Sequence, residues 1–180
     1  RALFCNHVVR ELTGSRIRVL TPEDVVRYWD LIPDKSTTSA DTSAVAVFPK
    51  EGPNEDLRKV ALDIIGKKST KVPLLISGLL PVPADNELGF TFTETDYVDA
   101  KETHFLTKDG RVKYAEGKGL VSSEDGIKCW VPDNQSGLRW ACRDRVGGLY
   151  FRYVRLLDSD SYGRVQLISG VAAEKIMGKK

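Results

Sequence analysis

The feature that most constrains the fold of this chain is an alternation of apolar and polar residues over 138–157, interrupted by Gly147-Gly148. Alternation with a period of two is typical of strands that bury one face. A Gly-Gly pair between two such runs favours a two-residue turn in which both glycines take positive φ. The segment therefore predicts a β-hairpin, and a two-residue turn places Arg143 directly opposite Arg152.

This register divides the hairpin into an apolar face and a basic face. The face that we expect to be buried contains Leu138, Trp140, Cys142, Leu149, Phe151, Tyr153 and Leu157. The face that we expect to point outward contains Arg139, Arg143, Arg145, Tyr150 and Arg152. Like charges opposite each other in a ladder are destabilising, and an anionic partner would explain them. Guanidinium groups beside an aromatic ring suit phosphate contacts and base stacking, so these five residues are predicted to bind a polyanion.

The distribution of charge offers a second interpretation of the basic face. The net charge of the chain is only +2, which is too small to indicate nucleic-acid binding by itself. Residues 85–102 carry six acidic side chains and one basic one, whereas residues 126–168 carry seven basic and four acidic ones. The arginines of the hairpin could therefore be neutralised within the molecule by the acidic segment.

Cysteine usage and hydropathy indicate a reducing, cytoplasmic-type compartment and no membrane span. Cys5, Cys129 and Cys142 show no Cys-x-x-Cys spacing, and their odd, low number argues against a disulfide-stapled secreted scaffold. A Cys129–Cys142 disulfide between neighbouring strands remains an alternative. No run approaches the roughly 18 apolar residues of a membrane helix, and the start lacks a signal-peptide pattern. Because the first residue is Arg1 rather than methionine, we expect a processed product or a piece of a larger protein.

The first 80 residues combine helical and strand signals. Residues 2–12 fit a helix better than a hairpin into 16–20. Thr21-Pro22-Glu23-Asp24 predicts a helix start, because Thr caps, Pro suits the first turn and acids complement the dipole. That helix should reach about Leu31 and stop before Pro33. A strand at 44–48, a helix from Asn54 to Gly66 and a strand at 72–76 predict a βαβ unit with a right-handed crossover.

From residue 81 onward the signals are almost all β. The predicted strands are 88–95, 103–107, 111–115, 126–131, 138–144, 149–157 and 164–168, followed by a short helix at 171–177. Asp109-Gly110 predicts a hairpin that joins 103–107 to 111–115. Short strands at this spacing indicate an antiparallel sheet curled into a barrel or sandwich. We therefore predict an α+β fold, with a small mixed α/β portion (residues 1–80) packed on a mostly antiparallel β portion (residues 81–180) in one compact unit.

A cluster of acidic residues with one histidine is the weaker candidate site: Asp96, Asp99, Glu102 and His104. Glu102 and His104 are two residues apart, so both would point to one face of a strand. Carboxylates with an imidazole can hold a divalent metal or act as a general base. Acids before a strand more often form a solvated loop, and this spacing matches no established metal-binding loop. No nucleophile elbow, phosphate loop or dinucleotide fingerprint accompanies the cluster, so no cofactor is expected.

These patterns favour binding or assembly over catalysis. The first hypothesis is a module that recognises nucleic acid or an acidic protein surface through the basic hairpin. The alternative is a protein-interaction or surface module excised from a larger protein or polyprotein, without chemistry of its own. A metal-dependent or hydrolytic enzyme that uses the acidic cluster is the third hypothesis. Among the aromatic residues, most of which should pack in the core, Trp130 beside the strand-ending Pro132 is expected to be a half-exposed contact.

Overall fold

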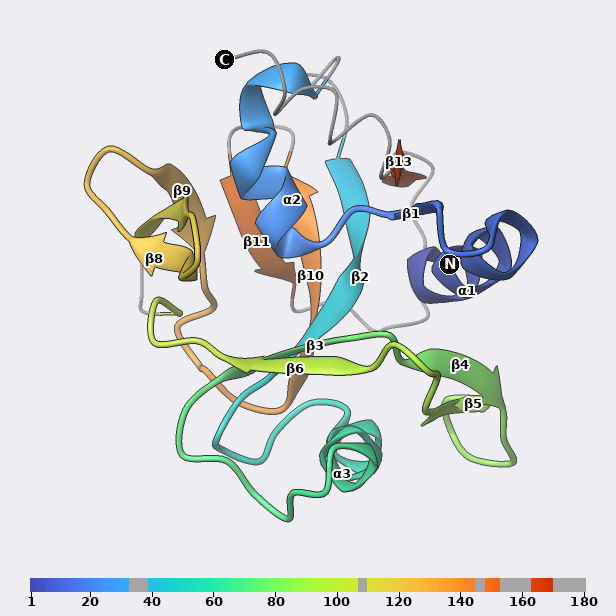
Figure 1. Cartoon of the computed structure of the whole chain (residues 1–180). Coiled ribbons are helices and arrows are strands. Elements are labelled where there is room, and N and C mark those ends of the chain that lie inside the picture. Colours follow the sequence, from blue (N-terminus) through green and yellow to red (C-terminus); the bar gives the residue numbers. More distant parts are fainter. Residues whose placement is uncertain (33–38, 107–109, 145–147, 153–162, 170–180) are drawn as a thin grey trace.

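The computed structural model describes the chain except for residues 33–38, 107–109, 145–147, 153–162 and 170–180 (Figure 1). Its helices are α1 (Ala2–Thr13), α2 (Pro22–Arg27), the 3-10 helix η1 (Trp29–Leu31) and α3 (Glu55–Ile64). Its strands are β1 (Ile17–Val19), β2 (Ser39–Val47), β3 (Leu74–Ser77), β4 (Leu80–Pro83), β5 (Phe90–Thr93), β6 (Asp99–Glu102), β7 (Arg111–Ala115), β8 (Gly119–Ser122), β9 (Ile127–Trp130), β10 (Leu138–Asp144), β11 (Gly148–Arg152), β12 (Gly163–Val165) and β13 (Leu167–Ser169).

The helix predicted over residues 2–12 and the helix start predicted at Thr21 are confirmed. The helix from Asn54 forms without a side-chain capping bond from that residue, and the helix predicted at 171–177 lies outside the described residues. Helix α1 ends where Gly14 takes the left-handed conformation, with φ 58°, which glycine adopts without strain. Helix α2 begins with a capping box, in which the hydroxyl of Thr21 accepts from the backbone N–H of Asp24 while the Asp24 carboxylate accepts from the backbone N–H of Thr21. The Gly14 cap ends α1, and the Thr21 cap begins α2 as the sequence predicts. Helix α2 itself ends at Arg27, short of the predicted Leu31, and η1 covers Trp29–Leu31.

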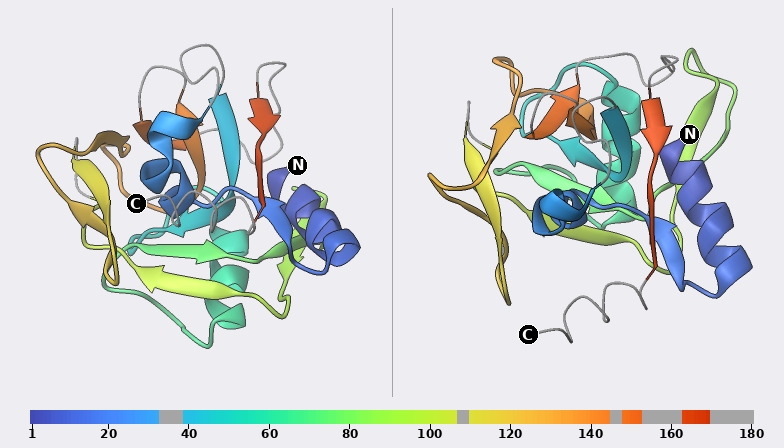
Figure 2. Two further views of the ribbon diagram at one scale, coloured as in Figure 1. Left: turned by 45° about the horizontal axis from the view of Figure 1, so that its top comes forward. Right: turned by 90° about the horizontal axis from the view of Figure 1, so that it is seen from above.

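Most strands belong to one curled sheet with the order β6-β3-β2-β10-β11-β9-β7-β8, and β12 pairs with β2 beside this path. Neighbours run antiparallel except for the parallel pairs β9–β11 and β2–β12. Two small sheets, β1–β13 and β4–β5, flank it. The main sheet curls into a half-barrel rather than a closed barrel (Figures 1 and 2). The predicted α+β class with a mostly antiparallel, curled sheet is therefore confirmed.

The half-barrel buries apolar side chains on both faces. On the concave face, α2 contributes Val25 and Val26 to a cluster that includes Phe48 and Phe151. On the convex face, α3 contributes a second cluster that includes Leu57 and residues of β2, β3 and β10. Alternate residues of the central strand β2 enter the two clusters, as the two-residue period of a strand requires.

Strands from both predicted portions share the main sheet, because β2 and β3 lie between β10 and β6. Two predicted connections are wrong. The strands on either side of α3 are antiparallel, since the chain after the helix returns to the end of the sheet that it left and pairs Val47 with Leu74. Residues 103–106 form no strand, and β7 instead pairs with β8 and β9.

The hairpin itself is present, but its register differs from the predicted one. Strands β10 and β11 are antiparallel neighbours, with Arg143 opposite Leu149 and Trp140 opposite Arg152. Relative to the predicted pairing of Arg143 with Arg152, the strands are shifted by three residues. An odd shift moves every side chain of one strand to the other face relative to its partner. The tight two-residue turn on which the prediction rested is therefore wrong, because Gly148 is already part of β11.

Gly148 is required by the neighbouring strand rather than by a turn. A Cβ atom at this position would overlap the backbone carbonyl oxygen of Lys128 in β9. We therefore predict that Gly148→Ala lowers the free energy of unfolding by about 3 kcal/mol, as overpacking against rigid backbone does. In Gly117→Ala, the control, the added methyl meets open space and only the positive φ of 72° is unfavourable, at about 1 kcal/mol. Urea unfolding measures both, and equal losses would contradict this assignment.

Candidate functional site

Two arginines of the predicted polyanion site are buried. Arg139 is 1% exposed and Arg143 is 0% exposed, so the expectation that they point outward is wrong. Arg139 donates from Nε to the carbonyl oxygen of Ser136 and from Nη2 to that of Asn134, each at 3.1 Å. The guanidinium of Arg143 lies 6.0 Å from the centre of the Trp29 ring. Both side chains are therefore part of the interior, because helices α2 and α3 cover opposite faces of the sheet at β10.

The other three predicted site residues have different outcomes. Tyr150 is half-buried in β11. Arg152 is paired with Trp140 in the ladder, but its side chain lies outside the described part of the chain, as does the whole of Arg145. The five residues therefore do not form the single outward face that the two-residue turn predicted.

A different surface combines basic and aromatic side chains, and we call it the basic–aromatic face. It consists of Arg111, Lys113, Lys128, Trp130 and Tyr150 on the convex side of strands β7, β9 and β11. Their sequence neighbours Val112, Cys129 and Leu149 are each 0% exposed in the concave core. Side chains alternate between the faces of a strand, so the five residues lie on the opposite side. Helix α3 packs on β2, β5 and β10.

The aromatic centre of this face is Trp130, which is 39% exposed, so its predicted partial exposure is confirmed. The ammonium of Lys128 lies 3.5 Å from the centre of its ring, a cation–π contact. Tyr150 is the direct neighbour of Trp130 in the parallel β9–β11 ladder, and Arg111 is the direct neighbour of Lys128. Lys113 is exposed and pairs with the exposed Asp125 at 3.1 Å.

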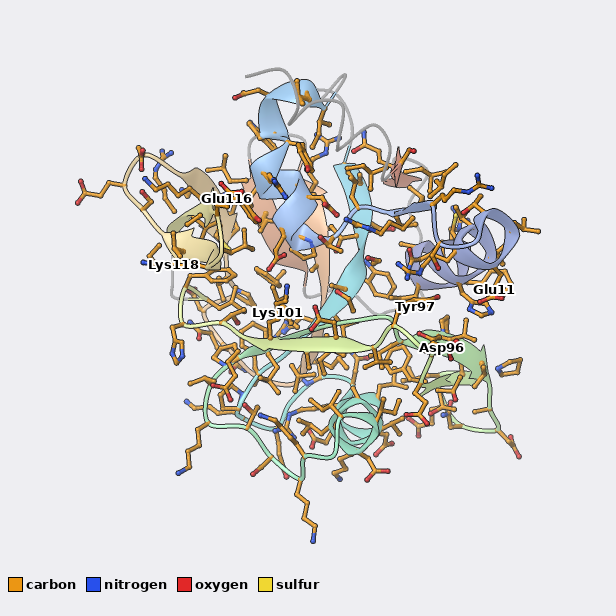
Figure 3. All side chains as sticks on the ribbon, in the orientation of Figure 1. Glu11, Asp96, Tyr97, Lys101, Glu116 and Lys118 are labelled. Carbon is orange, nitrogen blue, oxygen red and sulfur yellow. The ribbon has the colours of Figure 1, made fainter. Side chains whose placement is uncertain are left out.

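A polar cleft of about 360 Å³ lies on the concave side, at the open seam of the half-barrel. Its walls come from α1, from β1 and α2, from β6 and from the β7–β8 hairpin. Lys101 lies on β6 between Tyr97, which is near α1, and Lys118, in the β7–β8 turn (Figure 3). The charged residues that line the cleft are Arg10, Arg18, Arg27, Lys101, Lys118, Glu23, Asp24, Asp99 and Glu102.

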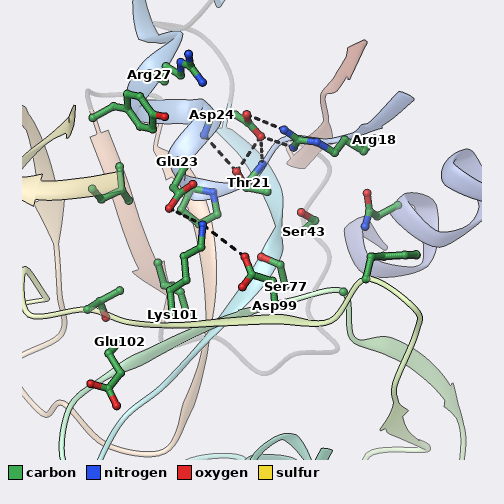
Figure 4. Close-up of a pocket in the computed structure, with 18 of the residues that line it drawn as sticks. Arg18, Thr21, Glu23, Asp24, Arg27, Ser43, Ser77, Asp99, Lys101 and Glu102 are labelled. Carbon is green, nitrogen blue, oxygen red and sulfur yellow. Dashed lines mark hydrogen bonds and ion pairs between the residues drawn. The ribbon is translucent and has the colours of Figure 1, made fainter. Parts of the chain in front are cut away.

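Ion pairs organise the middle of the cleft (Figure 4). Arg18 donates to both carboxylate oxygens of Asp24, with Nη2 and Oδ1 2.9 Å apart. The ammonium of Lys101 lies 3.0 Å from Oε1 of Glu23 and 3.4 Å from Oδ2 of Asp99. Burial opposes the negative charge of Asp24, but the hydrogen bonds and the charge of Arg18, with the bonds from Thr21, outweigh it, so the pKa of this carboxyl lies below its usual value.

Glu23 lies close to both edges of the sheet at the seam. It binds Lys101 of the edge strand β6, and its Oε1 would lie 2.9 Å from a Cβ atom at Gly119 of the other edge strand, β8. Glycine is favoured at position 119 for two reasons: its φ is +71°, and a side chain there would crowd the Glu23 carboxylate. The sequence contains a signal for Glu23 as a first-turn acid of α2, but no signal for its distant partner.

The predicted acidic cluster is only partly assembled. Asp99 and Glu102 line the cleft, where Asp99 binds Lys101. Glu102 pairs at 3.3 Å with Lys67, which does not line the cleft. Asp96 and His104 are exposed and do not line it. Among the residues that the structure describes, no three histidine, cysteine or acidic side chains are placed to hold a metal ion. Cys129 is a free thiol, so the disulfide alternative is wrong; β11 separates its strand from that of Cys142.

Comparisons with protein-family models, with curated proteins and with solved structures find no match for this chain. In the described part of the chain, no helix has the length and apolar character needed to cross a membrane. The basic–aromatic face and the cleft are therefore interpreted from their geometry alone.

The low pKa of Asp24 predicts a pH-dependent contribution to stability. The pKa of an unfolded aspartate is about 3.9, and the folded value is lower. The carboxylate therefore stabilises the fold above about pH 4, and this stabilisation is lost as the pH falls through the folded pKa. Asp24→Asn should lower the free energy of unfolding by about 2 kcal/mol at pH 7, and by clearly less at pH 3.

Urea unfolding at both pH values measures this difference. Asp63→Asn, which changes an exposed aspartate of α3, is the matched control and should have little effect at either pH. A loss for Asp24→Asn that is the same at pH 7 and pH 3 would contradict the ion-pair account.

Proposed function

We propose that this protein is a binding module that recognises single-stranded nucleic acid on the basic–aromatic face. The observation that carries the proposal is Trp130, a large aromatic ring that is 39% exposed, beside Tyr150 and under the ammonium of Lys128. Proteins that bind single-stranded nucleic acid combine exposed aromatic rings with basic residues, because every base has a face that can stack on a ring. Trp130, exposed on a sheet between basic residues, matches this arrangement. The function stays in the class that the sequence favours, but apart from Tyr150 it is proposed on different residues.

The two rings supply the stacking platform. Neighbouring strands are about 4.8 Å apart, so Trp130 and Tyr150, paired in the ladder, offer adjacent apolar surfaces on one side of the sheet. Lysine carries its charge on a flexible stem. The ammonium of Lys128 can therefore leave the ring for a phosphate when a base stacks on the indole.

The cations supply the phosphate contacts. Arg111 and Lys113 alternate along β7 and are both exposed. The side chains of the Lys113–Asp125 ion pair are 49% and 74% exposed. Exposed pairs contribute little, so this one does not prevent Lys113 from binding a phosphate. Three cations and two rings on three neighbouring strands match a short stretch of single strand better than a duplex groove.

The proposal predicts that labelled oligo(dT) binds in fluorescence anisotropy and that binding weakens as salt rises, with a slope of about −2 for three phosphates. Trp130→Ala should weaken binding by about 10-fold or more, the usual effect of losing one base–ring stack. Lys128→Gln should weaken it and reduce the salt slope by about 0.7. Lys68→Gln, which removes an exposed charge after α3, should change neither affinity nor slope beyond a small amount.

A comparison with polyglutamate distinguishes nucleic acid from the second class of partner, an acidic protein surface. The proposal expects oligo(dT) to bind more tightly than polyglutamate and only oligo(dT) binding to depend on Trp130. If polyglutamate binds as tightly and Trp130→Ala changes nothing, the surface recognises acidic protein instead. Absence of oligo(dT) binding at low salt would overturn the proposal outright.

A further inference from the structure

One end of the cleft, formed by the inner side of α1, holds hydrogen-bond donors that lack acceptors. Asn6 lines the cleft and is 4% exposed. Its Oδ1 accepts from the backbone N–H of Val19 at 2.9 Å. This bond settles the orientation of the amide, because only the oxygen can accept. The Nδ2 group is therefore the other end of the amide, and it has no hydrogen-bond partner in the described part of the chain.

Arg10 lies one helical turn after Asn6, so both residues are on the same side of α1. Its guanidinium stacks over Tyr97, 3.8 Å from the centre of the ring. The phenol oxygen of Tyr97 in turn lies 3.4 Å from Nδ1 of His7, and burial raises the pKa of this phenol. Stacking holds the plane of the guanidinium and leaves the N–H groups at its edge directed away from the ring. Among the described residues, Nε of Arg10 is buried and has no acceptor.

The cations in the middle of the cleft, in contrast, already have acidic partners. Arg18 is bound by Asp24, and Lys101 is bound by Glu23 and Asp99. Asp99, an acidic residue of the cleft lining, is thus already engaged by Lys101. Glu11 and Asp96 act on Tyr97 through their charge but do not line the cleft. The donors that stay available at this end are those of Asn6 and Arg10, which together carry a single positive charge.

We infer that the α1 end of the cleft binds the carboxylate of a small organic acid, with Asn6 Nδ2 and Arg10 as its donors. A carboxylate carries one negative charge and accepts several hydrogen bonds in one plane, which matches one cation and one amide. The rest of the ligand extends along the cleft past Ser77 toward Leu75 and Phe105. The cleft volume of about 360 Å³ lies within the range of small-molecule sites.

This site is separate from the proposed nucleic-acid surface. The cleft is on the concave side of the sheet, and the basic–aromatic face is on the convex side. Neither Asn6 nor Arg10 belongs to the basic–aromatic face, and none of that face's five residues lines the cleft. Failure of oligo(dT) binding therefore neither supports nor contradicts the carboxylate site, which is decided by its own titration.

The test is a titration of the ¹⁵N-labelled full chain with succinate at constant ionic strength, with chloride as the reference anion. The side-chain NH₂ resonances of Asn6 and the Nε–H resonance of Arg10 should shift and saturate together. Inorganic phosphate, the competing source of negative charge, should bind more weakly. Tighter binding of phosphate than of succinate would overturn the assignment of a carboxylate, and no saturable shift with either would overturn the site.

Two variants test the donors separately. Asn6→Asp keeps an oxygen for the Val19 N–H but replaces the donor with a negative charge, and it should weaken succinate binding by about 10-fold or more, the usual loss for a hydrogen bond to a charged group. Arg10→Gln should do the same and keeps α1 intact if a buried aspartate at position 6 impairs folding. Arg16→Gln, an exposed arginine outside the cleft, is the matched control. Unchanged succinate affinity in Arg10→Gln would refute the site.

Discussion

The position of α2, and with it the shape of the cleft, depends on the carboxylate of Asp24. This group accepts hydrogen bonds from the backbone and hydroxyl of Thr21, each at 2.8 Å, and from both terminal nitrogens of Arg18. One side chain therefore caps α2 and binds β1. Because α2 fills the concave side of the sheet while β1 packs against α1, Asp24 places both walls of the cleft. A bidentate pair of this kind contributes geometry as much as energy.

Burial on both faces of the central strands explains why the arginines of β10 are not a ligand surface. An apolar–polar alternation is normally interpreted as one dry face and one wet face. In β10 both faces are covered, so the polar positions need internal partners. Arg139 finds them in the carbonyl oxygens of its preceding loop. The buried Arg58 of α3 behaves alike and donates from Nε to the carbonyl oxygen of Phe48 at 2.9 Å.

Signals that act over a few residues could be predicted from the sequence, whereas those that depend on distant partners could not. The Thr21 cap, the strands of the hairpin and the α+β class follow from local patterns. The register of β10 and β11 does not, because it is set by what lies on either side of the pair. Gly148 illustrates this: its pattern suggests a turn, but its small size is needed by Lys128 in a neighbouring strand.

The candidate sites divide in the same way. Trp130 could be predicted as a half-exposed contact because Pro132 ends its strand, which is local information. The cleft could not be predicted, since its ion pairs join the first turn of α2 to β6, more than seventy residues later. Charge totals suggested that the acidic segment could neutralise basic side chains, and within that segment Asp99 pairs with Lys101, which also binds Glu23 of α2. Charge counts show that both signs of charge are available, but only the topology determines which side chains pair.

Strand β7 shows how one element can serve two surfaces without conflict. Its even-numbered side chains, Val112 and Tyr114, face the core and the cleft, and its odd-numbered ones, Arg111 and Lys113, lie on the convex side. The two proposed sites therefore share a backbone but no side chain. Substitutions at separate sites with no shared partner usually have additive effects. The curled sheet thus separates the two surfaces, while α2 packs against β7 and β8 on the concave side.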